Sequence, residues 1–310
     1  MKYEEPLVSV ILPTYNRAHI IEKSIKSVLD QTFTNFELLI VDDGSDDNTE
    51  KVVKNIDDPR IKYIKCMENK GANVARNIGI STVKADYIAF QDSDDEWYTD
   101  KLKKQVTAMQ GSLPSIGVVY SGYWRMQDNK KTYIPTETTT QLEGDISYQL
   151  LMSNFIGTPT MLIRKECFEK VGNFDEKLPR FQDWDLVIRL SKYYHFKYIN
   201  EATMNAYIQT DSLTSNQEAQ FMAYKMIFKK HYNDFSKDKK LFIKSHEVMG
   251  IQSYLNGNAK EGKDYMWKAY KADPLNFKLL FKYILILPDV SIYKKVQKIY
   301  QFFSSKSEKI

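Results

Sequence analysis

The sequence is poor in the residues that define several large classes of protein. Two cysteines in 310 residues, Cys66 and Cys167, are too few for a disulfide framework or a cysteine-ligated zinc site. The four histidines are scattered, without the spacing of a metal-binding pair. The apolar run Tyr283 to Leu287 is far shorter than the roughly 20 residues of a membrane-spanning helix. Residues 1–6 are polar and acidic, unlike a secretory signal. We therefore expect a soluble cytoplasmic protein.

The composition is nevertheless that of a chain that can build a core. Hydrophobic residues make up 43% and charged residues 27%, which excludes a disordered or collagen-like chain. Neither a G-x-G-x-x-G sequence nor a phosphate-binding P-loop occurs. These absences argue against a dinucleotide dehydrogenase and against a Walker-type nucleotidase.

Charge is distributed unevenly along the chain. Residues 1–216 contain 26 Lys and Arg against 31 Asp and Glu, whereas residues 217–310 contain 18 against 9. The basic segment fits either solvated helix faces or a surface for anionic lipid heads or an anionic acceptor. No recognised nucleic-acid-binding motif accompanies the charge, so we expect no nucleic acid partner.

The first 95 residues alternate between strand and helix patterns. Strand patterns at 7–12, 36–41, 61–65 and 87–90 are separated by helical spacing at 18–31, 48–56 and 72–83. Ser45 or Asp46 can cap the second helix. This order predicts an α/β fold with a Rossmann-like, mainly parallel sheet flanked by helices and joined by right-handed crossovers. Ligands of such sheets bind at the carboxyl ends of the strands.

The rest of the chain is less regular and then becomes helical. We expect a helix after Asp100, strands at 117–126 and 160–164, a polar loop at 128–131, and helices at 146–152 and 183–194. From residue 217 the pattern is helical, which predicts domains at 1–216 and 217–310. Residues 243–276, with their segment 257–276, are similar to one tetratricopeptide hairpin. An ordinary helical hairpin packed on the main domain fits better, because repeat arrays need about three copies.

The strongest candidate for a metal site is the run Asp92-Ser93-Asp94-Asp95, directly after the fourth predicted strand. Three carboxylates this close repel one another unless a cation lies among them. Oxygen ligands suit Mg²⁺ or Mn²⁺. The alternative is an acidic turn that caps the next helix.

Other polar residues follow the first and second strands or begin helices. A carboxylate of Asp42-Asp43 can accept from a nucleobase or a ribose, although a turn also explains this segment. Tyr15 can stack on a base or lie at a rim. Arg76 can pair with phosphate or lie on a helix surface. Asp183 can cap a helix or act as a general base, with Trp184 beside it as a platform for a sugar ring.

Taken together, these segments resemble the family-two inverting glycosyltransferases of the GT-A fold, which build bacterial surface polysaccharides and teichoic-acid decorations. The likeness runs from about residue 7 to 216. Its motifs, in family order, are V-S-V-I-L-P-T-Y-N-R, V-D-D-G-S-D-D, G-A-N-V-A-R-N-I-G, F-Q-D-S-D-D-E-W, V-G-N-F-D-E and Q-D-W-D-L.

The resemblance implies a role for each matching residue. Asp183 would be the catalytic base, and Asp94 with Asp95 would ligate Mn²⁺ or Mg²⁺ on the diphosphate. The nucleotide sugar would be bound by Pro13, Tyr15, Arg17, Asp43, Arg76, Asp92 and Ser93. Within that set, Pro13 and Tyr15 would line the uracil pocket, Asp43 would accept the uracil N3–H, Arg76 would reach the base or diphosphate, and Asp92 would hold the ribose or sugar side. Contacts to the acceptor or sugar would come from Trp97, Gln182, Trp184 and Gln209.

Two positions depart from the family pattern. Gln182 stands where the family often has Glu beside the base, so the pKa of Asp183 should be lower than in a Glu-Asp pair. Gln209 stands where the family often has histidine, which puts an extra contact to metal or phosphate in question.

The resemblance implies an inverting, metal-dependent transfer of a sugar from a nucleotide donor, UDP by preference. The acceptor would be a hydroxyl of a cell-surface glycan, a teichoic acid or a lipid-linked molecule. The helical segment would contact the acceptor, a second copy of the chain, or the inner face of an anionic membrane. Three alternatives stay open: another donor such as dTDP-rhamnose, a nucleotidyltransferase with a similar sheet, and a non-catalytic assembly module.

Overall fold

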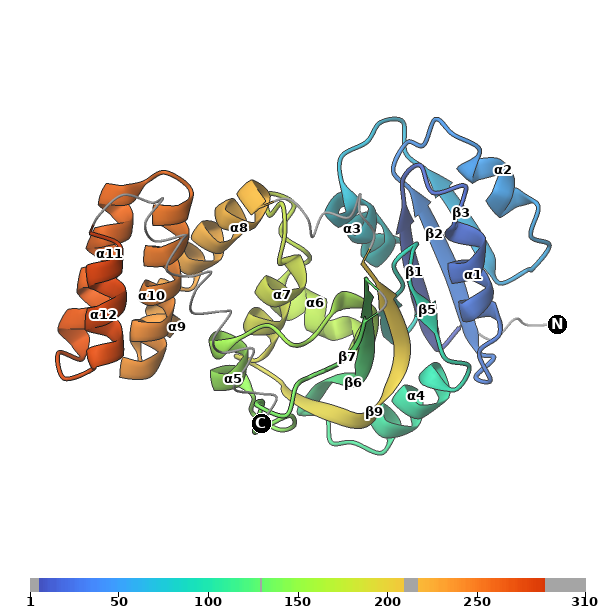
Figure 1. Cartoon of the computed structure of the whole chain (residues 1–310). Helices are drawn as coiled ribbons and strands as arrows, with labels where there is room; N and C mark the ends of the chain where they lie inside the picture. Colours follow the sequence, from blue (N-terminus) through green and yellow to red (C-terminus); the bar gives the residue numbers. More distant parts are fainter. Residues whose placement is uncertain (1–5, 129, 209–216, 288–310) are drawn as a thin grey trace. The chain divides into compact units, whose positions relative to one another are not determined.

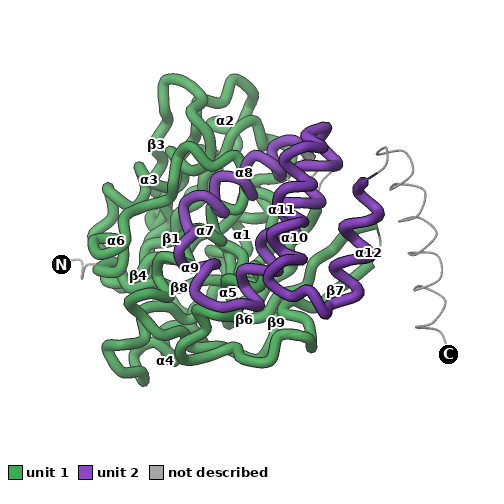
Figure 2. Tube along the Cα trace, turned by 90° about the vertical axis from the view of Figure 1, so that its left-hand side faces the viewer, with its two compact units in different colours: residues 1–215 green, residues 216–310 purple. Residues whose placement is uncertain are grey.

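The computed structural model describes residues 6–128, 130–208 and 217–287. The chain divides into two compact units, residues 1–215 and 216–310, which Figure 2 shows in green and purple. This division lies next to the boundary expected from the sequence. Unit 1 is a mixed α/β structure and the described part of unit 2 is helical, so the expected fold class is confirmed.

Unit 1 is organised around a β-sheet whose strands follow the order β3-β2-β1-β4-β8-β6-β9-β5, with β7 paired to β6. The strands are β1 (Val8–Thr14), β2 (Phe36–Asp42), β3 (Ile61–Lys65), β4 (Tyr87–Phe90), β5 (Glu96–Trp97), β6 (Ile116–Gln127), β7 (Lys130–Ile134), β8 (Met161–Arg164) and β9 (His195–Tyr207). The helices of this unit are α1 (Ile21–Leu29), α2 (Thr49–Lys54), α3 (Ala72–Thr82), α4 (Lys101–Gln110), α5 (Ser147–Met152), the 3₁₀ turn η1 (Thr158–Thr160), α6 (Lys165–Val171) and α7 (Gln182–Leu190).

The half of the sheet built by β1 to β4 is parallel, as predicted. β1 pairs with β2 and β4, and β2 with β3, all in parallel register. Every residue of β1, β2 and β4 is buried, which explains why these strands are mostly apolar in sequence. Figure 1 shows α1 and α3 on opposite sides of these strands. The loops that follow β1, β2 and β4 therefore meet at one edge of the sheet.

The other half of the sheet is mixed, because it combines antiparallel and parallel pairs of strands. β8 lies antiparallel between β4 and β6, whereas β9 runs parallel to β6 with register shifts. We did not expect β9. It alternates polar and apolar residues only loosely, and most of its side chains are half-buried or exposed, so its strand pairing depends on β6 more than on its own sequence pattern.

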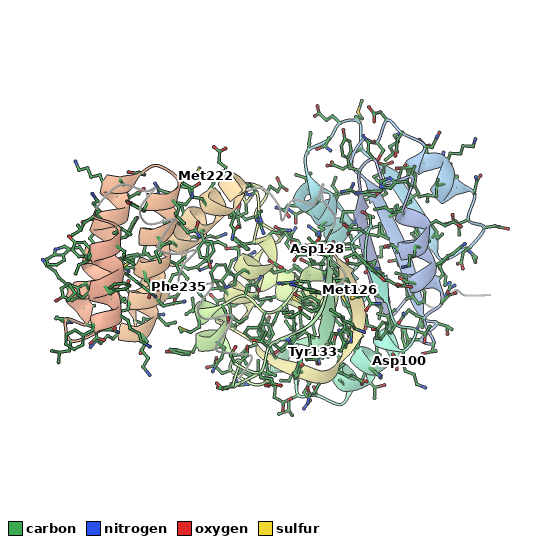
Figure 3. The ribbon with its side chains drawn as sticks, viewed as in Figure 1. Asp100, Met126, Asp128, Tyr133, Met222 and Phe235 are labelled. Carbon is green, nitrogen blue, oxygen red and sulfur yellow. The ribbon has the colours of Figure 1, made fainter. Side chains whose placement is uncertain are left out.

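Aromatic contacts support this half of the sheet. Figure 3 labels Tyr133 on β7, whose hydroxyl lies 2.9 Å from the hydroxyl of Tyr198 on β9. The polar loop expected at 128–131 is shorter than predicted, because β7 already begins at Lys130.

Several local predictions about helices are corrected by the structure. Neither Ser45 nor Asp46 caps α2: Asn48 occupies the cap position, and the Asp47 carboxylate accepts the N–H of Thr49 at 2.8 Å. Helix α7 ends at Leu190 rather than near residue 194. The short helix α6 lies in a segment for which we predicted no helix.

The described part of unit 2 consists of α8 (Gln217–Lys230), α9 (Tyr232–Ser236), α10 (Lys239–Leu255), α11 (Ala259–Ala272) and α12 (Phe277–Leu285). Helices α10 and α11 form the expected hairpin and cross at two glycines. A Cβ on Gly262 would lie 2.7 Å from the carbonyl oxygen of Gly250, so glycine is needed for this approach. In residues 6–128, 130–208 and 217–287, no helix is long and apolar enough to span a membrane.

Candidate functional site

The loops that follow β1 and β2 are joined by hydrogen bonds. The backbone N–H of Asn16 donates to the Ser45 hydroxyl at 2.9 Å, and the N–H of Asp46 donates to the Asn16 side chain at 3.0 Å. The N–H of Arg17 donates to the hydroxyl of Thr49 at 3.0 Å. The two loops therefore form one wall at the carboxyl edge of the sheet, where the sequence placed a ligand site.

The adjacent Asp42 and Asp43 have different structural partners. Asp42 closes its own turn by accepting the N–H of Ser45 at 2.8 Å, and it also accepts the Tyr63 hydroxyl. Asp43 accepts the backbone N–H groups of Lys70 at 3.0 Å and Gly71 at 2.7 Å, one on each carboxylate oxygen. Each oxygen of Asp43 keeps a second lone pair, so bracing this loop and accepting from a base are compatible.

Tyr15 is the most accessible of the residues predicted to contact the base. Its side chain is 42% exposed, whereas Pro13 is buried and Arg17 is half-buried. An exposed phenol at the end of a buried strand is available for stacking on a planar group. Pro13 can shape the wall but offers little surface to a ligand.

Arg76 is buried, which excludes the alternative of a surface arginine. Its guanidinium donates to Asp92 Oδ1 at 2.6 Å and lies 3.4 Å from the side-chain oxygen of Asn73. The guanidinium also lies over the ring of Phe174. Its Nε is buried and has no hydrogen-bond acceptor among the described residues. A buried cation thus links helix α3 to the acidic loop after β4.

The acidic loop concentrates negative charge at one place. Burial raises the pKa of Asp95 well above its usual range, and the neighbouring Asp92 and Asp94 act in the same direction. The N–H of Tyr207, near the end of β9, donates to Asp95 Oδ1 at 3.1 Å and opposes this shift. Asp92, Ser93 and Asp94 are half-buried.

A polar stripe on helix α1 holds the backbone of this loop. The Ser24 hydroxyl lies 2.9 Å from the carbonyl oxygen of Asp92 and 2.5 Å from that of Asp95. Gln91 Nε2 also donates to the carbonyl of Asp95, at 2.9 Å, and the N–H of Trp97 donates to the Ser27 hydroxyl at 3.2 Å. These side chains are buried, so the loop is fixed by contacts that solvent cannot replace.

The acidic loop suits a hard divalent ion that retains other ligands. No group of three or more His, Cys, Asp or Glu side chains in the described parts of the chain forms a ready-made cation site. Asp94 and Asp95 nevertheless supply oxygen ligands where the repulsion between carboxylates would be relieved by a cation. Mg²⁺ and Mn²⁺ accept one or two carboxylates and complete their coordination with water and phosphate, so the donor set fits them.

Asp183 lies in the first turn of α7, immediately after the helix start. Its Oδ1 accepts the amide of Asn154 at 3.1 Å and the N–H of Trp184 at 2.7 Å. Burial raises the pKa of Asp183 to about 6, with a smaller contribution from Asp92, and both hydrogen bonds and the charge of Arg76 oppose that shift. That the pKa of Asp183 is lower than it would be in a Glu-Asp pair stays a prediction. The main cause of the raised pKa in this structure is burial.

The structure brings the separate predicted segments into one electrostatic neighbourhood. The charges of Arg76 and Asp92 both act on the titration of Asp183, although these residues lie on α3, the loop after β4, and α7. Burial raises the pKa of Tyr123, on β6, and the charges of Asp183 and Asp95 add to that effect. Tyr123 therefore lies within electrostatic range of both Asp95 and the candidate base.

The residues expected to contact acceptor or sugar are less favourably placed. Trp97 and Trp184 are 3% and 4% exposed, and Trp184 Nε1 donates to the carbonyl of Leu150 at 2.5 Å. Both rings are almost fully covered by protein, and their role as a platform for a sugar stays a prediction. Gln182 is half-buried beside Asp183. Gln209 lies outside the described residues.

The sequence alone did not identify Asn154, Tyr123 or Ser24. Asn154 is in an irregular loop, and Tyr123 reads as one more residue of a buried strand. Ser24 had a detectable signal, because Ser24 and Ser27 share a helical spacing and flank the apolar positions of the same helix. A small polar stripe on such a helix indicates a buried polar contact.

Comparison with known proteins identifies relatives of this chain. The family model described as Glycosyl transferase family 2 matches residues 9–172. An uncharacterized glycosyltransferase of Rickettsia prowazekii is 30% identical over 82% of this chain and 81% of its own length. TuaG of Bacillus subtilis, a glycosyltransferase named for teichuronic acid biosynthesis, is 37% identical over 52% of this chain and 64% of its own. WfgD of Escherichia coli, named as a β-1,3-glucosyltransferase that uses UDP-Glc and a GlcNAc-diphosphoundecaprenol, is 42% identical over 41% and 49%.

Solved structures share the fold at low sequence identity. TarS of S. aureus, residues 1–349 in complex with UDP-GlcNAc, superposes with a TM-score of 0.69 at 17% identity, over 95% of this chain and 91% of that one. The mannosyltransferase PcManGT of Pyrobaculum calidifontis, in complex with GDP-Man and Mn²⁺, gives a TM-score of 0.59 at 16% identity, over 99% and 87%.

Proposed function

This chain belongs to glycosyltransferase family 2, and from that membership we propose that it transfers a sugar from a nucleotide donor, UDP by preference, to a hydroxyl group with inversion at the anomeric carbon. Asp183 is the general base of this proposal. The observation that carries it is a carboxylate with a pKa near 6 in the same charged neighbourhood as Arg76 and Asp92.

The chemistry asks for a group that takes a proton from the acceptor hydroxyl as the new bond forms. A general base works best when its pKa lies close to the operating pH, since it is then largely deprotonated and still a useful proton acceptor. Asp183, with its pKa raised to about 6 by burial, meets that condition better than an exposed carboxylate would. Direct displacement from the face opposite the leaving diphosphate inverts the anomeric carbon and needs no covalent intermediate.

The donor end of the proposed site is the edge formed by the loops after β1, β2 and β4. Tyr15 offers an exposed ring to the base, and Asp43 keeps a free lone pair on each oxygen. Asp94 and Asp95 would hold Mn²⁺ or Mg²⁺, which makes the diphosphate a better leaving group. Arg76 and Asp92 form an ion pair whose two charges act on Asp183, and the ribose or sugar would lie beside this pair.

For the acceptor we propose a cell-surface polymer or its lipid-linked precursor. The support is the printed names of two relatives, which concern teichuronic acid and a diphosphoundecaprenol-linked sugar. The basic unit 2, with apolar side chains exposed on α12, supports a peripheral contact with an anionic membrane, where such an acceptor would lie.

The test is donor turnover by the full chain with UDP-, GDP- and dTDP-sugars in the presence of Mn²⁺. We expect Asp183→Asn to lower kcat by about 10²–10⁴-fold while UDP binding, measured by calorimetry, is retained. The matched control is Asp86→Asn, an exposed carboxylate before β4. Normal turnover by Asp183→Asn would remove the base from the proposal, and release of pyrophosphate from a nucleoside triphosphate would indicate a nucleotidyltransferase instead.

A further inference from the structure

The hydrogen bonds to the candidate base are one-sided. Both donors to Asp183, the Asn154 amide and the N–H of Trp184, act on Oδ1 at 3.1 and 2.7 Å. No described residue donates to Oδ2. The backbone donor is supplied by the helix start itself, whereas the amide of Asn154 comes from a separate loop between α5 and η1. One carboxylate oxygen is therefore held, and the other is left to a substrate.

Asn154 is itself fixed in place. Its side-chain oxygen accepts the N–H of Ile156 at 3.3 Å, so the amide group is oriented by its own loop. Phe155 and Ile156 are buried and anchor that loop in the core. Trp184 Nε1 donates to the carbonyl of Leu150 at 2.5 Å, which ties α5 to the helix that carries Asp183. The distance from Asn154 to the base is thus set by buried neighbours on both sides.

We propose that Asn154 is a positioning residue for the reaction: its Nδ2–H holds Oδ1 of Asp183 so that Oδ2 points to the acceptor hydroxyl and receives its proton. The inference rests on the proposed role of Asp183 and deepens it. Without the amide, the carboxylate would keep the Trp184 N–H but could turn about its Cβ–Cγ bond, and fewer encounters with the acceptor would be productive.

Other charged groups around Asp183 stay unchanged when Asn154 is replaced. Arg76 from α3, Arg180 from the loop before α7, Asp92 after β4 and Tyr123 from β6 all interact electrostatically with this carboxylate. Asn154 is neutral, so its removal alters one hydrogen bond without altering the net charge. A hydrogen bond to the ionised carboxylate lowers its pKa, and losing it should raise that pKa.

The experiment compares Asn154→Leu, Asn154→Asp and the wild type. Leu removes the amide at similar volume, whereas Asp keeps the shape but replaces the donor by a second carboxylate. We expect Asn154→Leu to lower kcat by about tenfold with little change in KM for the donor. The acid limb of the kcat–pH profile should move upward by roughly half to one pH unit in Asn154→Leu and further in Asn154→Asp. The control is Gln149→Leu, which removes an amide from α5 that donates to Gln141 and not to Asp183.

A second measurement reads the contact without any substrate. Carboxyl ¹³C NMR of metal-free protein reports the pKa of Asp183, with the signal assigned by its loss in Asp183→Asn. An unchanged Asp183 titration in both Asn154 variants would overturn the inference, as would a wild-type kcat and pH profile in Asn154→Leu. A shifted titration combined with full turnover by Asp183→Asn would show that the base assignment fails, although the contact exists, so the two proposals fail in distinguishable ways.

Discussion

At the scale of single residues, the buried carboxylate of Asp183 lowers the stability of the folded protein, and this cost follows from its proposed role as the base. Burial raises its folded-state pKa from 3.8 to about 6, which means that ionising this side chain is harder in the folded protein than in the unfolded chain. Below pH 3.8 the group is protonated in both states and costs nothing. As the pH rises from 3.8 through 6, the unfolded state gains from ionisation first, and stability is lost.

We therefore expect Asp183→Asn to stabilise the protein at neutral and alkaline pH. An uncharged amide avoids the ionisation penalty, which amounts to roughly 2–3 kcal/mol once the pH is above about 7. It can still accept the bonds from Trp184 and Asn154. Thermal unfolding should show a gain in Tm of roughly 5 °C at pH 8.

The pH dependence of this gain in Tm serves as an internal control. The difference between variant and wild type should shrink steadily toward pH 4, because the wild-type carboxylate then becomes neutral in the folded state. A difference that is constant from pH 4 to pH 8 would mean that the substitution acts through packing rather than through the charge.

Asp42 and Asp43 show how far residue types alone can be interpreted. Two successive acidic residues after a strand indicated a ligand site, and the structure places them at the expected edge. It also shows that both carboxylates bind backbone N–H groups, which no sequence pattern reveals. A loop distant in sequence, at residues 68–71, supplies the donors to Asp43, so this part of the site depends on tertiary packing.

At the scale of elements, the buried face of helix α1 supports both the core and the candidate metal loop. Ile21, Ile25 and Val28 are fully buried against the sheet. Ser24 lies at the edge of the same buried face, three residues after Ile21 and four before Val28, and contacts the carbonyls of Asp92 and Asp95. The carboxylates that would hold the metal ion therefore take their direction from a helix that contributes no ligand itself.

We expect Ser24→Ala to weaken metal binding without unfolding the chain. The substitution removes a buried hydroxyl whose one proton is shared between two carbonyl oxygens, so the loop should sample more conformations and the affinity for Mn²⁺ should fall by about tenfold. The measurement is a Mn²⁺ titration followed by electron paramagnetic resonance, in the presence of UDP. Ser81→Ala on α3 is the matched control, because that hydroxyl bonds only within its own helix. An unchanged Mn²⁺ affinity in Ser24→Ala would separate this helix from the metal site.

The elements that could be predicted are those whose pattern is set locally. β3 and β4 begin and end at the predicted residues, and α3 differs by one residue, because apolar periodicity and flanking turns define them. β9 could not be predicted, since its thirteen residues are mostly half-buried and gain their strand structure from pairing with β6. Asn154 was missed for a related reason: its partner, Asp183, lies 29 residues away in the sequence.

At the scale of the whole molecule, charge and apolar exposure coincide in the same part of the chain. Residues 217–310 contain twice as many basic as acidic residues. On α12, Phe277 and Phe281 are 79% and 55% exposed, and Lys278 follows Phe277 directly, whereas Lys282 is paired with Glu247. Lysine side chains can extend past an apolar surface toward lipid phosphates, so this pattern is typical of a helix that lies on a membrane.

We expect the protein to sediment with vesicles rich in phosphatidylglycerol at low salt and to remain in solution with phosphatidylcholine alone. Raising the salt concentration should weaken the binding, because it screens the attraction between lysines and lipid phosphates. Replacing Phe277 and Phe281 together by Ser should lower the partition coefficient by at least about tenfold, since both rings would otherwise leave water. Leu113→Ser, which removes an exposed apolar side chain from unit 1, should have no effect. Equal binding to both kinds of vesicle, or unchanged binding by the double variant, would show that α12 is not the membrane contact.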